Sequence, residues 1–260
     1  MREQPAAERG YQLEWSKTHP RMLDQEFRTR KARKIVAVLR EALAGRDLSG
    51  LRVLDVGASA GIITGELGRV FGAVVGIDID ENGIERGRQN LTGPNQELLV
   101  GDAMNIAFPD ESFDVAVLNH TYEHIPDARR AFDELWRVLR PDGVVYVGAP
   151  NRLALVEPHY KLVGLSWLPS RAADAYVRLA GKGERYYERP RTFRGLKRIT
   201  ARFELEDWTL RVIRDPARYA AEDVVPGAGI VRRLPQRLVA AIHPFIPTYI
   251  LILRKPSAAR

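Results

Sequence analysis

The stretch Leu51-Arg-Val-Leu-Asp-Val-Gly-Ala-Ser-Ala-Gly61 decides the fold. An apolar run leads into a turn of small residues, and Ile62-Ile-Thr64 then opens a helical pattern. This order predicts a buried parallel strand, a tight turn and a helix N-terminus whose backbone N–H groups point outward. Gly57 and Gly61 would let a ligand and the helix approach the backbone closely. An ordinary strand-to-helix turn is the alternative.

The carboxylate at the end of this strand favours one kind of ligand over another. Asp55 would repel a pyrophosphate and attract an ammonium or sulfonium group, and the Gly-x-x-x-Gly spacing differs from the Gly-x-Gly-x-x-Gly of dinucleotide-binding folds. The stretch resembles the first motif of class I S-adenosylmethionine (SAM) methyltransferases, acidic-x-Gly-x-Gly-x-Gly. Ser59 replaces the middle glycine, a small-for-small change that we expect the turn to tolerate.

Two further strands are predicted to end in carboxylates. Ala73–Asp78 is a short apolar run whose Asp78 lies 23 residues after Asp55, where an acidic residue can accept hydrogen bonds from ribose hydroxyls. Leu98–Asp102 is the third strand, and Asp102 with Ala103 would read the adenine edge. The carboxyl ends of parallel strands share one edge of the sheet, which is where such sheets bind ligands.

The second half of the predicted sheet carries the more specific motifs. A fourth strand, Phe113–Leu118, is followed by an amphipathic helix over Ala128–Leu139, a turn at Arg140–Gly143 and a fifth strand, Val144–Gly148. The block from 113 to 150 closely resembles small-molecule SAM methyltransferases, and with the first turn the resemblance covers about residues 50–152.

The nearest subfamily in this resemblance is the ubiquinone-biosynthesis O-methyltransferases. Its members share Glu123-His124, Pro126-Asp127 and Asn151-Arg152 with this chain. They place an acidic residue, cited as a metal ligand, where this chain has His120. We therefore predict no metal site.

Five apolar strand runs separated by helical patterns, together with a strong last strand, predict an α/β fold. We expect a doubly wound, seven-stranded, mostly parallel sheet, which is the class I SAM methyltransferase fold that the resemblance implies, with a helical insertion between strands five and six. The expected parts are an N-terminal helical lead-in or lid (1–48), a SAM-binding core (49–150), a basic helical insertion that caps the substrate (151–202) and C-terminal strands that complete the sheet (203–260). Within them we expect a helix over Arg28–Leu43, a sixth strand over Phe203–Ile213, a last antiparallel strand over Thr248–Arg254, and lid residues Tyr11 and Trp15.

The predicted cofactor is SAM. Asp55, Gly57 and Gly61 would hold its methionine part, Asp78 its ribose, and Asp102 with Ala103 its adenine. The neighbouring residues expected to complete this site are Ala58, Ser59, Ile79, Met104 and Asn119.

Methyl transfer to oxygen also needs a base that accepts the acceptor's proton. His120, Glu123 and His124 follow the fourth strand, near the expected position of the methyl group, and His159 in the insertion is a rival base. The alternative for His124 is a structural hydrogen bond to the start of the next helix.

Composition and charge limit the other functions. The chain has no cysteine, which excludes radical SAM chemistry and cysteine-dependent cytosine methylation. Its net charge is +7, yet residues 151–202 alone hold twelve basic and four acidic side chains, a net +8. An anionic lipid surface, an anionic acceptor or a merely solvated outer face would each explain this excess. The apolar stretch Leu238–Leu253 contains His243, Pro244 and Pro247, so we expect a cytoplasmic protein, at most peripheral to a membrane.

The sequence thus predicts an enzyme that uses SAM to methylate a small molecule, most readily at oxygen. Nucleic acid is disfavoured because Asn119-His-Thr-Tyr122 lacks the Asp/Asn-Pro-Pro-aromatic run of methylases that act on base amines. The alternative is a non-catalytic SAM- or nucleotide-binding regulatory module.

Overall fold

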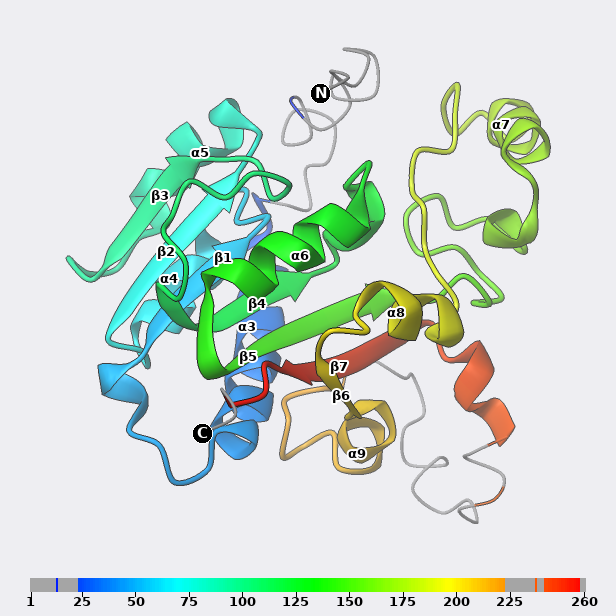
Figure 1. Ribbon diagram of the computed structural model, residues 1–260. Helices are drawn as coiled ribbons and strands as arrows, with labels where there is room; N and C mark the ends of the chain where they lie inside the picture. The colour runs from blue at the N-terminus through cyan, green and yellow to red at the C-terminus, as the bar shows by residue number, and fades with distance from the viewer. Residues whose placement is uncertain (1–12, 14–22, 223–236, 238–240, 258–260) are drawn as a thin grey trace.

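A seven-stranded sheet forms the centre of the computed structural model, which describes residues 23–222 and 241–257 together with Leu13 and Arg237. The strand order is β3-β2-β1-β4-β5-β7-β6 (Figure 1). The pairs from β3 to β5 are parallel, and β7 runs antiparallel to both of its neighbours. The predicted sheet and its antiparallel last strand are therefore confirmed.

The strands are β1 (Arg52–Val56), β2 (Ala73–Asp78), β3 (Gln96–Val100), β4 (Phe113–Asn119), β5 (Leu139–Pro150), β6 (Glu204–Asp207) and β7 (Thr248–Arg254). The α-helices are α3 (Gln25–Ala42), α4 (Ile62–Gly68), α5 (Glu81–Gly87), α6 (Ala128–Val138), α7 (Ser170–Leu179), α8 (Phe193–Ile199) and α9 (Thr209–Arg214). Short 3₁₀ turns are η2 (Leu48–Gly50), η3 (Arg88–Asn90), η4 (Tyr122–His124), η5 (Leu165–Trp167) and η6 (His243–Phe245).

Helices cover both faces of the sheet. On one face, α6 and α8 pack on the side chains of the central strands, and Phe132 and Leu135 of α6 are fully buried there. On the other face, α3, α4 and α9 enclose a second cluster that includes Leu39 and Leu67. The central strands are buried on both faces, which explains why they appear in the sequence as continuous apolar runs.

The predicted strand over Phe203–Ile213 is wrong in its second half. Only Glu204–Asp207 pairs with β7, and Thr209–Arg214 is helical. The Asp207 side chain accepts a hydrogen bond from the Thr209 N–H at 3.0 Å and so starts the helix. Trp208 and Val212 are buried four residues apart, a helical spacing that also fits a strand pattern over so short a run.

The turn predicted at Arg140–Gly143 is a distortion within β5. The register of β5 against β4 shifts between Phe113 and Val115, and Asp142 adopts a positive φ of 61°. The chain therefore turns locally without ending the strand, as a bulge does.

Residues 151–202 lie between β5 and β6 and hold η5, α7 and α8 (Figure 1). Within this segment, residues 160–186 form a small separate core in which Leu165, Ala173 and Val177 are fully buried, whereas α8 packs on the sheet. The lid residues predicted at Tyr11 and Trp15 lie outside the described residues.

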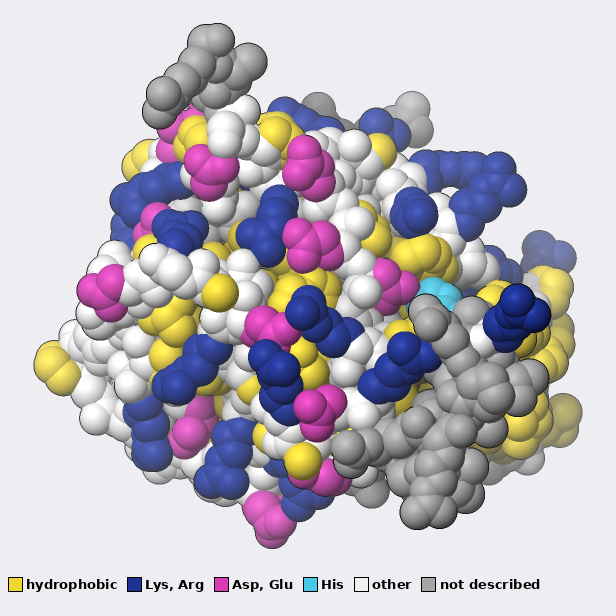
Figure 2. Space-filling view, turned by 90° about the horizontal axis from the view of Figure 1, so that it is seen from below, with side chains coloured by type: hydrophobic (Ala, Val, Ile, Leu, Met, Phe, Trp, Pro, Cys, Tyr) yellow, Lys and Arg dark blue, Asp and Glu magenta, His cyan; other side chains and the backbone are white. Residues whose placement is uncertain are grey.

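The molecular surface seen from below carries basic and acidic side chains that are interspersed rather than segregated (Figure 2). Within residues 23–222 and 241–257, no helix is both long enough and apolar enough to cross a bilayer.

Candidate active site

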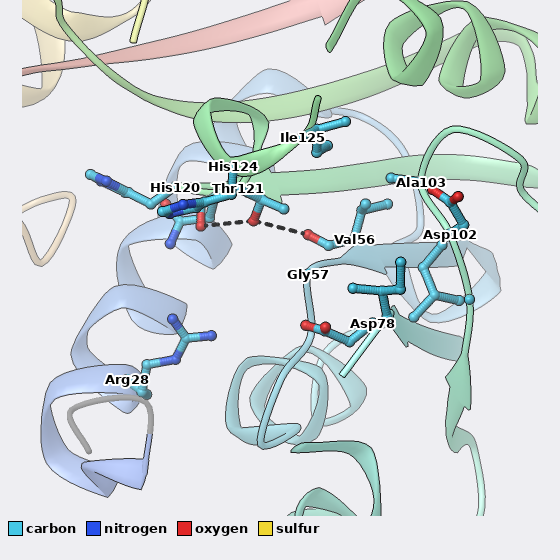
Figure 3. A pocket seen from close by; sticks show the side chains of 14 residues that line it. Arg28, Val56, Gly57, Asp78, Asp102, Ala103, His120, Thr121, His124 and Ile125 are labelled. Atoms are coloured by element: carbon cyan, nitrogen blue, oxygen red, sulfur yellow. Dashed lines mark hydrogen bonds between the residues drawn. The ribbon is translucent and has the colours of Figure 1, made fainter. Parts of the chain in front are cut away.

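A pocket opens at the carboxyl ends of the parallel strands (Figure 3). Its volume is about 700 Å³, counted out to its open mouth. Its walls come from the ends of β1, β2 and β4, the segment after β3, and the first turn of α3. The lining residues are Arg28, Val56, Gly57, Ile77, Asp78, Ile79, Gly101, Asp102, Ala103, Asn119, His120, Thr121, His124 and Ile125.

The turn after β1 forms the floor of the pocket. Gly57 has a φ of +80°, and a Cβ at this position would lie 2.5 Å from the Thr121 side chain, so only glycine fits. Thr121 closes this contact with a hydrogen bond from its hydroxyl to the Val56 carbonyl at 3.3 Å. The backbone of β1 and the loop after β4 are thereby held together at the pocket.

Asp78 at the end of β2 is fixed from two sides. One carboxylate oxygen accepts the Ser59 N–H at 2.8 Å and the other accepts the Asp80 N–H at 2.9 Å. Burial raises the pKa of this carboxyl, and the two hydrogen bonds oppose that shift. Each oxygen keeps a lone pair for a further donor, so the group can hold two hydroxyls of a ligand.

The segment after β3 supplies a second carboxylate. Asp102 accepts the Met104 N–H at 2.8 Å, which turns the chain so that Asp102 and Ala103 line the pocket. Met104 itself is buried in the apolar cluster behind them.

The loop after β4 brings two unusual groups to the pocket. His120 has a positive φ of 54°, a strained conformation for a residue with a side chain. Burial, helped by the charge of Lys31, holds the pKa of its imidazole well below the ordinary value. The buried Nδ2 of Asn119 has no hydrogen-bond partner among the described residues, so this amide can serve a ligand in the pocket.

Arg28 is a pocket residue that sequence reasoning missed. It lies in the first turns of α3 and is 5% exposed. Its guanidinium interacts electrostatically with the carboxylates of Asp55 and Asp78. Burial lowers the pKa of this guanidinium, and the two carboxylates oppose that shift. The sequence hardly distinguishes Arg28 as a pocket residue, because a single arginine on an amphipathic helix usually faces solvent.

Asp55 lies behind the pocket rather than in its wall. Its carboxylate is buried and accepts the Thr64 hydroxyl hydrogen bond at 2.8 Å. Burial raises the pKa of Asp55 to about 6, against the effects of Thr64 and Arg28. Asp55 therefore faces the N-terminal turn of α4 and interacts electrostatically with Arg28 in the pocket wall.

A buried cluster of histidines and glutamates adjoins the pocket. The Glu123 side chain is fully buried, and its Oε1 lies 3.7 Å from His124 Nε2 and 3.9 Å from His159 Nε2. Burial raises the pKa of Glu123 to about 8. For His159, burial lowers the pKa, but its hydrogen bond to Glu157 and the charge of Glu123 outweigh this effect and raise it. Within the described part of the chain, the ligand atoms of Glu123, His124 and His159 are the set that lies close enough together, within 4.8 Å, to hold a metal ion.

A second, wider cavity lies under residues 151–202. Counted out to its open mouth it measures about 1,550 Å³, and it shares His124 and Ile125 with the first pocket. Its lining includes four arginines, three carboxylates and two tyrosines: Arg152, Arg185, Arg189, Arg191, Glu123, Asp174, Glu188, Tyr186 and Tyr187. A molecule in this cavity would therefore meet both cations and aromatic rings next to the first pocket.

The structure brings most of the predicted site residues together. Those that line the first pocket are Gly57, Asp78, Ile79, Asp102, Ala103, Asn119, His120 and His124. Those that lie behind it or beside it are Asp55, Ala58, Ser59, Gly61, Met104, Glu123 and His159. Ser59 contributes its N–H to Asp78, whereas Gly61 (φ +67°) precedes α4 and packs under Gly87. The binding and catalytic roles of all these residues stay predictions.

Comparison with known proteins assigns the central part of the chain. Residues 54–147 match the family model of a methyltransferase domain. The chain is 33% identical over 101 residues to a demethylmenaquinone methyltransferase of Clavibacter sepedonicus, covering 38% of this chain and 41% of that protein. It is 28% identical over 163 residues to a ubiquinone biosynthesis O-methyltransferase of Rhizobium etli, covering 61% of this chain and 64% of the relative. The chain thus spans less than two thirds of the length of these relatives.

The fold agrees with a solved structure as well. A SAM-dependent methyltransferase from Mesorhizobium loti superposes with a TM-score of 0.56 at 16% identity, over 88% of this chain and 97% of that one. At this identity the likeness concerns the fold alone.

The fold and the pocket define an α/β protein that binds its ligand at the carboxyl ends of a doubly wound parallel sheet. The family match is more specific: residues 54–147 match a methyltransferase domain, and the relatives that this part of the chain resembles include SAM-dependent methyltransferases.

Proposed function

We propose that the chain is an enzyme that transfers a methyl group from SAM to a small-molecule acceptor. One observation carries this proposal: the pocket at the strand ends and the cavity under residues 151–202 share a wall, formed by His124 and Ile125. A cofactor in the first and an acceptor in the second would meet at this wall. Methyl transfer is an in-line displacement, so it needs two ligands that lie end to end.

The residues of the first pocket fit SAM. Asp78 would accept hydrogen bonds from the two ribose hydroxyls, and Asp102 with Ala103 would meet the adenine edge. The Arg28 guanidinium suits the carboxylate of the methionine part, and the Asn119 amide offers a donor near the wall. The bound cofactor would supply an activated methyl group on a sulfonium.

We propose oxygen as the methylated atom, with an imidazole of the histidine cluster as the proton acceptor. The relatives quoted above include an O-methyltransferase, and the imidazoles of His120, His124 and His159 all lie within 4.0 Å of Glu123. An oxygen acceptor must lose its proton at neutral pH, and imidazole is the side chain suited to take it.

Four arginines line the wider cavity against three carboxylates, and this excess, in a segment of net charge +8, favours an acceptor with an anionic group. We further propose that the acceptor is linked to a lipid, because residues 151–202 also expose apolar side chains. Val156 and Val163 pair in a short bridge and are 43% and 58% exposed, and Leu155 and Trp167 beside them are also exposed. Apolar and basic groups on one segment suit the surface of an anionic membrane.

Calorimetric titration with SAM and with its demethylated product tests the proposal. We expect both to bind, and Asp78→Ala to weaken binding about 10- to 100-fold because the ribose hydroxyls lose a charged acceptor. Glu97→Ala, an exposed carboxylate change on β3, is the matched control and should leave the affinity unchanged.

The outcomes separate the alternatives. If neither compound binds, the chain is neither an enzyme of this type nor a SAM-binding regulatory module. If SAM binds but no acceptor from a panel of phenols and anionic metabolites is methylated, the regulatory module is favoured. An unchanged affinity in Asp78→Ala would remove Asp78 from the site.

A further inference from the structure

The Glu123 carboxylate is buried without a hydrogen bond. It lies on η4, its side chain is 0% exposed, and neither Oε1 nor Oε2 has a hydrogen-bond partner among the described residues. A buried carboxylate in this state costs several kcal/mol unless it is protonated or a cation or a donor compensates it. A cation bound beside Glu123 would keep this group ionised and compensate its charge.

The spacing around Glu123 Oε1 is too long for hydrogen bonds and suits a shared ion. Its distances to His124 Nε2 and His159 Nε2 are 3.7 and 3.9 Å, whereas an N–H···O hydrogen bond spans about 2.7–3.2 Å. In a tetrahedral site with metal–ligand bonds of about 2.1 Å, ligand atoms lie roughly 3.4 Å apart. The two distances from Glu123 exceed this value by only a few tenths of an ångström, and all three ligand atoms lie within 4.8 Å of one another.

A carboxylate behind His159 orients that ring for this role, and a second carboxylate lies near His124. Glu157 Oε1 lies 2.8 Å from His159 Nδ1, and Glu157 Oε2 accepts the backbone N–H groups of His159 and Tyr160, both at 2.7 Å. With Nδ1–H donated to Glu157, Nε2 is the ring atom that would ligate an ion, and it faces Glu123. Glu188 Oε1 lies 3.9 Å from His124 Nδ1 on the far side of that ring. A carboxylate behind a ligating histidine is the usual support of a metal site.

We propose that Glu123, His124 and His159 bind one divalent transition-metal ion. Two imidazoles and one carboxylate are a ligand set typical of Zn²⁺ or Fe²⁺ sites that keep coordination positions open. Glu123 and His124 also line the cavity under residues 151–202, so the open positions would face that cavity.

The expectation of no metal rested on His120 alone, whereas the proposed site takes its third ligand from elsewhere in the chain. Glu123 and His124 follow β4, whereas His159 belongs to the segment between β5 and β6. The ion would therefore tie this segment to the edge of the sheet. It would also leave His120, whose Nδ1 lies 4.0 Å from Glu123 Oε1, as the imidazole that takes the acceptor's proton; this last role rests on the proposed function, whereas the metal site does not.

The test is a titration of the chelator-treated full chain with Co²⁺, which has visible absorption bands that report coordination by nitrogen and oxygen. We expect one equivalent to bind with bands of a four- or five-coordinate site, and Zn²⁺ to displace it. Glu123→Gln and His159→Asn should each lower the affinity at least about 100-fold, and Glu157→Gln about 10- to 100-fold as a positioning residue. His243→Asn is the matched control, because that histidine bonds to Asp207 outside the cluster.

Absence of stoichiometric Co²⁺ uptake would overturn the proposal, and so would uptake that Glu123→Gln and His159→Asn leave unchanged. His159→Asn keeps the test decisive if Glu123→Gln fails to fold, as circular dichroism would show. SAM titrations of the same samples separate the two proposals. SAM binding without metal uptake rejects the metal site alone, and metal uptake without SAM binding rejects the proposed function alone.

Discussion

Ser59 shows how one residue can fit a motif and still be strained. Its φ is +47°, its side chain is 2% exposed, and its Oγ has no hydrogen-bond partner in the described part of the chain. The sequence predicted that serine is tolerated here, and the structure accommodates it. A left-handed conformation costs a residue with a Cβ about 1–2 kcal/mol, and a buried hydroxyl without a partner adds to this cost.

Ser59→Gly should therefore stabilise the protein. The gain from relieved strain exceeds the entropy that glycine adds to the unfolded chain, about 0.5–1 kcal/mol, so we expect the free energy of unfolding to rise by about 1 kcal/mol. Urea denaturation measures the change. A lower free energy of unfolding for Ser59→Gly would mean that the hydroxyl has a stabilising contact in solution.

Asp55 should make stability depend on pH. Its pKa is raised to about 6 in the folded state, above an ordinary value of 3.8, so the folded protein favours the protonated form. The contribution of this group is fully present below pH 3.8 and is lost as the pH rises through 6. Between pH 4 and pH 8 the wild type should lose up to about 3 kcal/mol relative to Asp55→Asn, which keeps a neutral group there.

Denaturation of both proteins at a series of pH values measures this difference, and the titration of other carboxyl groups cancels in the comparison. Glu97→Gln, an exposed carboxyl on β3, is the control and should follow the wild type at every pH. Parallel curves for the wild type and Asp55→Asn would contradict the prediction.

At the scale of the element, helix α3 both packs against the sheet and contributes a side chain to the first pocket. Asp24 caps its N-terminus by accepting the Phe27 N–H at 2.9 Å, and Ile35, Val38 and Leu39 are buried against the sheet. The same first turns place Arg28 in the wall of the first pocket. The helix was predicted from its apolar spacing, but spacing alone does not say which charged residue faces a pocket.

Arg28→Met should weaken SAM binding about 10- to 100-fold, because a buried arginine–carboxylate pair is lost. The more specific prediction concerns discrimination: the wild type should bind SAM more tightly than decarboxylated SAM, and Arg28→Met should bind the two with similar affinity. Calorimetry with both compounds measures it. Arg33→Met, an exposed change on the same helix, is the control. If Arg28→Met still prefers SAM by the wild-type factor, Arg28 does not contact the carboxylate.

At the scale of the molecule, the site residues that the sequence predicts best are those whose positions follow from the parallel sheet. Gly57, Asp78, Asp102 and His120 meet in one pocket because each lies at or just after the end of a parallel strand, and the ends of these strands share an edge. Such residues can be found from local runs alone. Arg28 and His159 reach the site from a lead-in helix and from a segment with irregular structure, and no local pattern fixes where those elements pack.

The segment 151–202 combines an excess of basic residues, exposed apolar side chains and the lining of the wider cavity. Part of its apolar content is used in its own small core, as Leu165 shows, so burial explains those residues. Val163 and Trp167 are not explained in this way, because they are 58% and 47% exposed on the turn that also carries Leu155 and Val156. An exposed apolar turn within a basic segment is typical of a surface that contacts lipid.

We therefore expect the full chain to co-sediment with vesicles of anionic phospholipid at low salt, and to be released as the salt concentration rises. Trp167→Ser and Val163→Ser should each weaken this binding, Trp167→Ser by about 10- to 100-fold, because a buried aromatic side chain contributes about 1.5–3 kcal/mol. Val100→Ser is the matched control, since Val100 is 54% exposed at the opposite edge of the sheet, on β3. If anionic vesicles do not retain the wild type at low salt, or if both changes leave binding unaffected, the arginines serve an anionic acceptor in the cavity and the lipid contact is rejected.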